Sequence, residues 1–313
     1  MSPKSLLRAP AAIAYLLGAG GAQRSDGRAR ILMLHGTPRS EAACLERMLR
    51  WLKRTFDVVP LAQVARDAAA GDVRFRRQVA ITFDDGLRNN VEVAYPILKR
   101  LGLPATFFVC PSLIDAGRWL WNQEARQRLR SLSRSEEEIE AIIAQMKALP
   151  VDKRVEMERS IRAQTRDFVP SATERHLFDL AGWKELRALD PAIVTIGSHT
   201  LSHSILTSLP PAEVECELAD SRRILESRLG RPVEEFAYPN GDFDEQVLAC
   251  ARRHYAVAVS VEEAFVRPGS DPLRLPRVNV PFSALRLALA LHREKAAYRL
   301  VAPMSASGSQ VAI

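Results

Sequence analysis

Short apolar runs alternate along this chain with segments in which apolar residues return every three or four positions. The short runs are rich in Val, Ile, Leu and Phe, a composition typical of buried strands. They occupy residues 31–34, 79–83, 105–109, 193–196, 235–238 and 256–259. Strands that alternate with helices build βα units, in which helices cover a mostly parallel sheet. We therefore expect an α/β fold.

The segments between these runs predict amphipathic helices. Two of them carry apolar residues at near-helical spacing: Leu45, Met48, Leu49 and Leu52 in the first, and Val214, Leu218, Leu225 and Leu229 in the second. Gly102 and Gly230 each follow a basic, Leu-rich turn, where glycine commonly ends a helix. These two glycines are the expected helix stops.

From about residue 115 to residue 175 the alternation stops. This stretch is strongly charged and contains no convincing strand, but it has helical apolar spacing around Ile139, Ile142, Ile143 and Met146. A structureless loop of that length inside a domain would be unusual. We expect residues 30–300 to form one domain with a helical insertion at about 115–175, preceded by an N-terminal helical segment (1–29) and followed by a flexible tail (301–313).

Composition and charge narrow the class of protein. With 313 residues, 47% apolar and 26% charged, the chain can bury a large core, which argues against wholesale disorder. The net charge of +7 would attract anionic partners. The basic residues are dispersed, however, and no basic run is interleaved with aromatic residues, so nucleic-acid binding is not expected.

The N-terminus leaves the location of the protein open between two interpretations. Lys4 and Arg8 precede an apolar stretch at 11–17, which imitates a secretory signal, but residues 18–21 make a poor cleavage site. An amphipathic helix packed on the domain is the alternative. No stretch reaches the roughly 20 apolar residues of a membrane span, although peripheral membrane contact stays open. A cytoplasmic location is favoured, and a periplasmic or secreted one would follow from a signal peptide.

Four widely separated cysteines, with no Cys-x-x-Cys pair, indicate neither a zinc ribbon nor a disulfide framework; they are Cys44, Cys110, Cys216 and Cys250. We expect them to be reduced and structural.

Two adjacent acids follow the apolar run at 79–83. Asp84 and Asp85 precede Gly86, and the carboxyl ends of parallel strands form the catalytic face of βα-built sheets and barrels. Neighbouring side chains point in different directions, so one acid can bind a metal while the other faces a water. An Asp-Gly turn that merely reverses the chain explains this fragment equally well.

A pair of histidines follows the run at 193–196. His199 and His203 are four residues apart, a spacing that brings two imidazoles to one side of a helical turn and lets them bind one divalent ion. Such pairs often have no function. Two of only six histidines nevertheless lie together just after a strand, as the acids do, and this favours metal binding.

Together these fragments resemble the polysaccharide deacetylase family, also called the NodB-homology or carbohydrate esterase 4 family. Its motifs T-F-D-D-G and H-[ST]-x-x-H match residues 82–86 and 199–203, in that order. Residues 104–109 and 236–241 extend the resemblance, which covers roughly 30–280 apart from the insertion. The resemblance implies a distorted (β/α) barrel and a metal-dependent hydrolase that removes N-acetyl groups from N-acetylhexosamine units.

The family pattern also implies roles for single residues. Asp84 would be the catalytic base, and Asp85, His199 and His203 would hold the metal. Zinc is the expected ion, though cobalt, nickel or iron also suit two imidazoles and a carboxylate. Such an ion activates water and polarises the acetamide carbonyl, while Asp84 accepts the proton of the attacking water.

The family stabilises the oxyanion with a backbone N–H of a third motif, which corresponds to the turn at 238–241. Tyr238 and Asn240 are the candidate substrate and oxyanion residues, with Asn240 presenting the amide and Gly241 permitting the tight backbone. The commoner motif has an arginine before the prolines, where this chain has Ala237. Arg277, after an expected late strand, is the candidate substitute that orients Asp84; a surface arginine is the alternative.

The general acid that protonates the leaving amine is a second departure. Many members use a histidine in a late Leu-rich motif that this chain lacks, and neither His254 nor His292 fits well. His35 ends the run at 31–34 and should face the same catalytic end of the barrel. The subgroup with a late Leu-Pro-Arg often has a histidine here. The alternative is a packed histidine that caps the strand.

The expected substrate is an N-acetylated polysaccharide or a lipid-linked sugar. Two alternatives remain: a non-catalytic carbohydrate-binding relative, and a hydrolase of another amide or of an O-acetyl ester. Trp119 and Trp121 in the insertion fit sugar stacking less well than anchoring of the insertion to the core.

Overall fold

The computed structural model describes residues 28–71, 77–280 and 283–292 of the chain. Within these residues, seven parallel strands close into a barrel: β1 (Arg30–Leu34), β3 (Gln78–Phe83), β4 (Ala105–Val109), β5 (Val194–Ser198), β6 (Glu235–Ala237), β7 (Val257–Glu263) and β8 (Leu275–Asn279). The ring closes because β1 pairs with both β3 and β8. A short β2 (Asp57–Val58) extends β3 outside the ring. The expected α/β barrel is confirmed.

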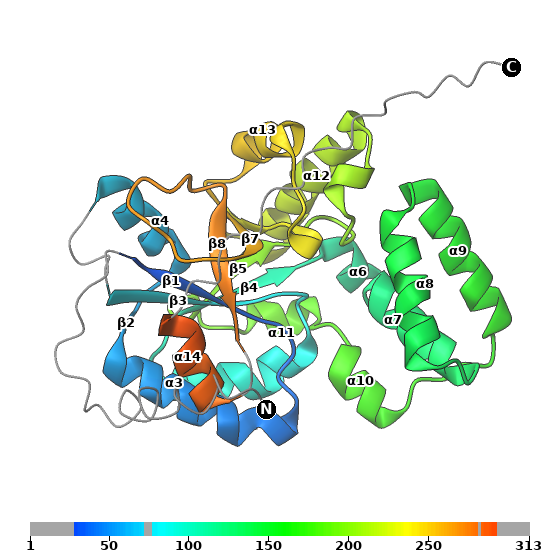
Figure 1. Cartoon of the computed structure of the whole chain (residues 1–313), viewed down its shortest axis with the longest axis horizontal. Helices are drawn as coiled ribbons and strands as arrows, with labels where there is room; N and C mark the ends of the chain where they lie inside the picture. Colours follow the sequence, from blue (N-terminus) through cyan, green and yellow to red (C-terminus); the bar gives the residue numbers. More distant parts are fainter. Residues whose placement is uncertain (1–27, 72–76, 281–282, 293–313) are drawn as a thin grey trace, which may run out of the picture.

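Helices surround this barrel (Figure 1). They are α3 (Ala42–Thr55), α4 (Leu61–Ala70), α5 (Tyr95–Leu101), α6 (Pro111–Ala116), α7 (Trp121–Ser131), α8 (Glu136–Ala148), α9 (Val151–Gln164), α10 (Ala172–Phe178), α11 (Trp183–Arg187), α12 (Pro211–Leu229), α13 (Glu245–His254) and α14 (Ala284–His292). A π-helix, η3 (Asn90–Ala94), precedes α5, and three short 3₁₀ turns are η1 (Arg39–Glu41), η4 (Leu206–Ser208) and η5 (Pro239–Gly241).

The predicted helical faces are buried as expected. Leu45, Met48, Leu49 and Leu52 of α3 are all nearly inaccessible. Gly102 and Gly230 end α5 and α12 in the left-handed conformation, with φ of 63° and 68°, so both predicted stops are confirmed. A side chain would be strained at this φ, which is why glycine ends these helices.

Alternate residues of each strand pack on opposite sides of the barrel wall. Ile31, Ala80 and Phe108 belong to one buried cluster, which also contains Leu61 and Val64 of α4. Their strand neighbours belong to a second, larger cluster with the surrounding helices. Since strand side chains alternate between two faces, the first cluster fills the interior of the barrel and α4 closes one end of it.

Gly197 in β5 shows how tightly the interior is filled. A Cβ atom there would lie 2.5 Å from the ring of Phe108 and 2.9 Å from the carbonyl oxygen of Glu235. Neither neighbour can retreat, because one is a fully buried ring and the other is strand backbone. Glycine at this position therefore lets the strand pass close to the packed interior.

A buried carboxyl group, Glu235, lies on β6. It accepts hydrogen bonds from the Ala62 N–H (3.2 Å) and the Thr106 hydroxyl (2.8 Å) and is only 3% exposed. Burial raises the pKa of Glu235 from its usual 4.5 to about 7, against the lowering effect of these two hydrogen bonds.

The elevated pKa predicts how stability depends on pH. The folded state holds the Glu235 proton more tightly than the unfolded state does, so the free energy of unfolding should fall as pH rises from 4.5 to about 7. Glu235→Gln imitates the protonated acid and should raise stability by roughly 3 kcal/mol above pH 8, with little effect at pH 4. Urea unfolding across this range measures the difference. The exposed neighbour Glu234→Gln is the control, and equal curves for both variants would contradict the prediction.

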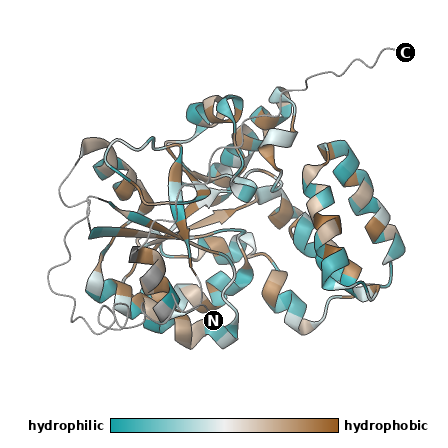
Figure 2. Ribbon diagram, viewed as in Figure 1, coloured by the Kyte–Doolittle hydropathy of each residue, from teal (hydrophilic) through white to brown (hydrophobic). Residues whose placement is uncertain are grey.

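The predicted insertion is helical and stands beside the barrel as α7 to α10 (Figure 1). Its own small core joins Trp121 to three of the predicted apolar residues, Ile139, Ile143 and Met146, and to Ile205 of the main domain. Figure 2 shows the consequence: these helices carry mixed brown and teal bands, whereas the central strands are mostly brown.

Both tryptophans of the insertion serve as anchors. Trp119 is 8% exposed and donates its indole N–H to the Asp179 carboxylate, and Trp121 is 5% exposed and donates to the carbonyl of His203. Stacking on a sugar would need an exposed ring face, so the anchoring interpretation is confirmed.

Several expectations concern the ends of the chain, the membrane and the cysteines. The predicted N-terminal helical segment lies outside the described residues except for its last two positions, and the predicted tail lies wholly outside them. No helix in the described part of the chain is long and apolar enough to cross a membrane. All four cysteines are free thiols, as expected.

Candidate active site

The alternation of the strands carries Asp84 and Arg277 into the barrel. Asp84 continues the inward series of Ala80 and Thr82 just past β3, and Arg277 follows Leu275 in β8. The two side chains form a bidentate pair, with Nη1 to Oδ1 and Nη2 to Oδ2 both at 2.7 Å. Arg277 has no exposed surface, so the alternative of a surface arginine is wrong. It also lies within the late strand and not after it.

Two groups that the sequence did not single out hold Arg277 in place. Its Nε donates to the carbonyl of Ser260 at 2.7 Å, and its Nη1 also donates to the Thr82 hydroxyl at 3.1 Å. That hydroxyl in turn donates to the carbonyl of Leu32. The guanidinium is therefore oriented by neighbouring strands, and a rigid fork meets both oxygens of Asp84.

Arg277 also keeps Asp84 ionised. Burial alone would raise the pKa of Asp84, but the charge and hydrogen bonds of Arg277 outweigh it and hold the pKa below its usual value. Each carboxylate oxygen accepts one bond from Arg277 and keeps a further lone pair. Asp84 is thus a charged carboxylate at the carboxyl end of the barrel whose oxygens can each accept a further hydrogen bond.

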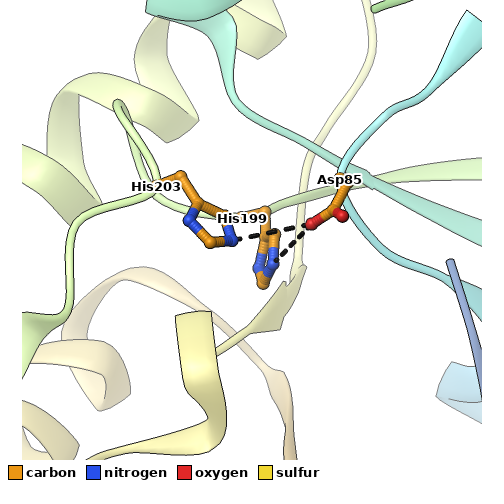
Figure 3. A group of neighbouring side chains, drawn as sticks. All are labelled: Asp85, His199 and His203. Atoms are coloured by element: carbon orange, nitrogen blue, oxygen red, sulfur yellow. Dashed lines mark ion pairs between the residues drawn. The ribbon is translucent and has the colours of Figure 1, made fainter. Parts of the chain in front are cut away.

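Asp85 turns the other way because its backbone is left-handed, with φ of 75°, followed by Gly86 at 68°. A Cβ on Gly86 would lie 2.9 Å from a methyl carbon of Val109, so glycine is needed for the turn. The turn brings Asp85 to the two histidines, as Figure 3 shows: Oδ1 lies 3.7 Å from Nε2 of His199 and 3.5 Å from Nε2 of His203.

The histidine pair does not lie on a helical turn, and this part of the prediction is wrong. The chain leaves β5 at His199 in an irregular turn with left-handed backbone at Thr200 (φ 64°) and His203 (φ 61°). The rings still meet, with centroids 4.8 Å apart. The spacing of four is therefore satisfied by a loop that curls back on itself.

Hydrogen bonds from three directions hold this loop. The Cys110 thiol donates to the carbonyl of His199, and the Trp121 indole donates to that of His203 at 3.3 Å. Glu217 of α12 accepts from the N–H and hydroxyl of Ser202. The helical insertion, through Trp121, is thus part of the support of the histidine loop, a role that the sequence did not reveal.

The surroundings of His199 favour a neutral imidazole with one free nitrogen. Nδ1 of His199 lies 2.7 Å from the carbonyl oxygen of Ala237, to which it donates, so Nε2 carries the lone pair that faces Asp85. Burial, assisted by the charge of His203, lowers the pKa of His199 to about 4. Burial opposes ionisation of Asp85, yet interaction with His203 and the charges of the nearby histidines hold its pKa well below the usual value.

This donor set fits a divalent ion. Ligand atoms around a tetrahedral ion with metal–ligand bonds of 2.0–2.2 Å lie roughly 3.3–3.6 Å apart. The two oxygen–nitrogen separations here are 3.5 and 3.7 Å, and Asp85, His199 and His203 are all nearly buried. Nδ1 of His203 is buried and has no hydrogen-bond partner among the described residues, so its tautomer is free to suit coordination through Nε2.

His35 lies at the same end of the barrel. It follows β1, its side chain is exposed, and its charge helps to lower the pKa of both Asp84 and Asp85. Exposure argues against the alternative of a packed histidine that caps the strand. The position suits a group that exchanges protons with solvent and substrate.

In the turn at 238–241, the two candidate residues have different surroundings. The Tyr238 ring is fully buried, its hydroxyl donates to Leu273, and its N–H donates to Val259, so neither donor faces the site. Asn240 is exposed, and its backbone is in the left-handed conformation, with φ of 58°. No acceptor in the described part of the chain pairs with its backbone N–H. Asn240 therefore keeps a donor available, whereas Tyr238 packs in the core.

The sequence also matches a known family. The family model described as polysaccharide deacetylase matches residues 73–259, more than half of the chain.

The chain belongs to the polysaccharide deacetylase family.

A curated relative of this polysaccharide deacetylase is distant in sequence. YxkH of Bacillus subtilis (strain 168) is 22% identical over 203 residues, which are 64% of this chain and 51% of YxkH. The chain thus spans about half the length of this curated relative.

Two solved structures share the fold at 19% identity. The deacetylase PplD of Streptococcus pyogenes, in complex with acetate, has a TM-score of 0.59 over 86% of this chain and 99% of its own. IcaB from Ammonifex degensii has a TM-score of 0.58, over 85% and 96%.

Proposed function

We propose that this polysaccharide deacetylase is a metal-dependent hydrolase that removes N-acetyl groups from N-acetylhexosamine units of a polysaccharide or a lipid-linked sugar. The observation that carries the proposal is the pairing of two carboxylates with different partners. Asp84 is held by Arg277, while Asp85 faces His199 and His203. One acid is thereby kept as a base and the other as a ligand.

Asp85, His199 and His203 would hold the ion, with zinc expected and cobalt, nickel or iron also compatible. When bound, such an ion polarises the acetamide carbonyl and lowers the pKa of water, so that attack proceeds near neutral pH. The protein must then supply a base for the water proton, a donor for the oxyanion and an acid for the amine.

Asp84 is the proposed base. Its carboxylate stays ionised beside Arg277, and its remaining lone pairs can accept the proton of the attacking water. Arg277 is a positioning residue: its two hydrogen bonds prevent rotation of the carboxylate. It occupies the role that the commoner third motif gives to an arginine at the position of Ala237.

Asn240 and His35 complete the proposed reaction. The N–H of Asn240 donates to the oxygen that becomes negative when water adds to the acetyl carbon. The carbon–nitrogen bond then breaks, acetate leaves, and His35 delivers a proton to the departing amine. Tyr238 contributes by packing beneath the turn that presents Asn240, through ring contacts with Phe236 and Phe243.

Acetate release tests this function. After removal of metals with a chelator, the protein should be inactive on oligomers of N-acetylglucosamine, and zinc or cobalt should restore release of one acetate per free amine formed. An O-acetylated oligosaccharide without N-acetyl groups serves as the control substrate. Release of acetate from the ester substrate alone would mean that the protein is an O-acetyl esterase and not an amide hydrolase. Tight sugar binding without acetate from either substrate would identify a carbohydrate-binding relative.

A further inference from the structure

A second group of metal-binding side chains lies on the outside of the barrel, between α12 and α13. Cys250 and His254 are four residues apart on α13, so their side chains share one face of the helix. Glu215 faces them from α12: its Oε2 accepts from the Cys250 thiol at 3.0 Å, and its Oε1 lies 2.7 Å from Nε2 of His254. All three potential ligand atoms lie within 4.8 Å of one another.

We propose that Glu215, Cys250 and His254 form a second divalent-metal site, suited to zinc, that clips α13 to α12. A thiolate, an imidazole and a carboxylate make a mixed ligand set that zinc binds well, with water in the fourth position. The site itself does not depend on the reaction proposed above, but the ion count expected below includes the metal proposed for the active site.

The separations fit coordination with small adjustments. Ligand atoms around tetrahedral zinc lie roughly 3.3–3.7 Å apart, depending on whether sulfur or a lighter atom is involved. Here the two carboxylate contacts, each through a different oxygen, are 3.0 and 2.7 Å, and all the ligand atoms lie within 4.8 Å of one another, so the separations have to change by roughly 1 Å. Rotation of the half-exposed Glu215 side chain is sufficient for that.

The helix ends support a cation at this place. α13 ends at His254, so the negative end of its helix dipole lies beside the three ligands, although the Arg222 guanidinium already donates to the His254 carbonyl. Arg253 also bonds to Glu215, but its side chain is largely exposed and can move into solvent when an ion binds. Binding would require the Cys250 thiol to lose its proton to solvent and His254 to carry its proton on Nδ1 and not on Nε2, so that the sulfur and Nε2 could both hold the ion.

This site is separate from the Asp85, His199 and His203 site. Glu217, which holds Ser202 of the histidine loop, is two residues from Glu215, and residues two apart on a helix lie on different faces. Cys250 lies on α13, on the outside of the barrel, whereas Asp85, His199 and His203 follow the carboxyl ends of β3 and β5. A metal here would join the helix that follows the histidine loop to the helix that follows the Asn240 turn.

Sulfur distinguishes the two sites experimentally, because the ligands proposed for the first site are only oxygen and nitrogen. The full-length, metal-free protein is titrated with Co²⁺ and followed by absorption, and bound zinc is counted separately. We expect about two zinc ions per chain and a thiolate-to-cobalt charge-transfer band. Cys250→Ser should abolish the band and reduce zinc to about one, and His254→Gln should weaken both.

The matched control is Cys216→Ser, because Cys216 is exposed and lies beside Glu215 on α12. It should keep the band and both ions. A wild-type protein with no thiolate band, or a band that persists in Cys250→Ser, would overturn the proposal and leave a hydrogen-bonded network centred on Glu215. Circular dichroism of each variant checks folding, and Glu215→Gln, which keeps Cys250 and His254 intact, provides a second test.

Discussion

Asp84→Asn is expected to lower kcat for acetate release by about 10²–10⁴-fold, the usual contribution of a general base. The amide has the shape of the carboxylate but cannot accept the proton of the attacking water. Asp84 also carries no part of the proposed metal site, so metal content should stay near the wild-type value. Acetate release and metal analysis on the same preparation measure both quantities.

Asp85→Asn is the matched control for this result. It removes a proposed ligand only one residue away, so it should lose metal and activity together, and excess zinc should restore part of both. If Asp84→Asn instead lost metal while Asp85→Asn retained it, the roles of the two acids would be reversed. Activity unchanged in Asp84→Asn would remove it as the base.

Arg277→Met should have the largest effect on stability, lowering the free energy of unfolding by about 3–5 kcal/mol. The substitution removes a cation from a site with no exposed surface and leaves Asp84 as an uncompensated buried charge. Its hydrogen bonds to Ser260 and Thr82 are lost as well. Denaturant unfolding of the metal-free protein measures the change without interference from ion binding.

Arg130 provides the comparison, since it also makes two hydrogen bonds to one carboxylate, that of Glu136. Both side chains of that pair are well exposed. Arg130→Met should therefore cost less than about 1 kcal/mol, because solvent replaces the lost interaction. Adding Asp84→Asn to Arg277→Met should recover part of the loss, since the unpaired charge disappears. Equal effects of Arg277→Met and Arg130→Met would contradict the role assigned to burial.

The strand pattern was predictable because burial on both faces leaves a strong sequence signal. β1, β3, β4 and β5 coincide with predicted runs to within one or two residues. α3 buries its predicted face, and α12 buries its own except for the half-buried Leu229. β2 has two residues and β8 contains Pro276 and Arg277, so neither shows a continuous apolar run. An arginine in a strand is expected at a surface unless a buried acid is known to face it.

Local spacing was a weaker guide to the conformation of the site. The histidines at positions 199 and 203 lie on an irregular loop, because contacts from Cys110, Trp121 and Glu217 stabilise left-handed backbone that no local preference favours. Tyr238 was a candidate by motif position, yet its ring and hydroxyl belong to the core. In both cases residues far away in sequence decided the outcome.

The sequence by itself determined the chemical identity of the site: two acids after one strand, two histidines after another, and an alternation of strands and helices that brings strand ends together. These features are local, so the order of residues carries them. Only the tertiary structure decided that Arg277 meets Asp84 across 193 positions and that Trp121 of the insertion supports the histidine loop. Closure of the ring makes such partners neighbours, and neither composition nor spacing specifies which strands close it.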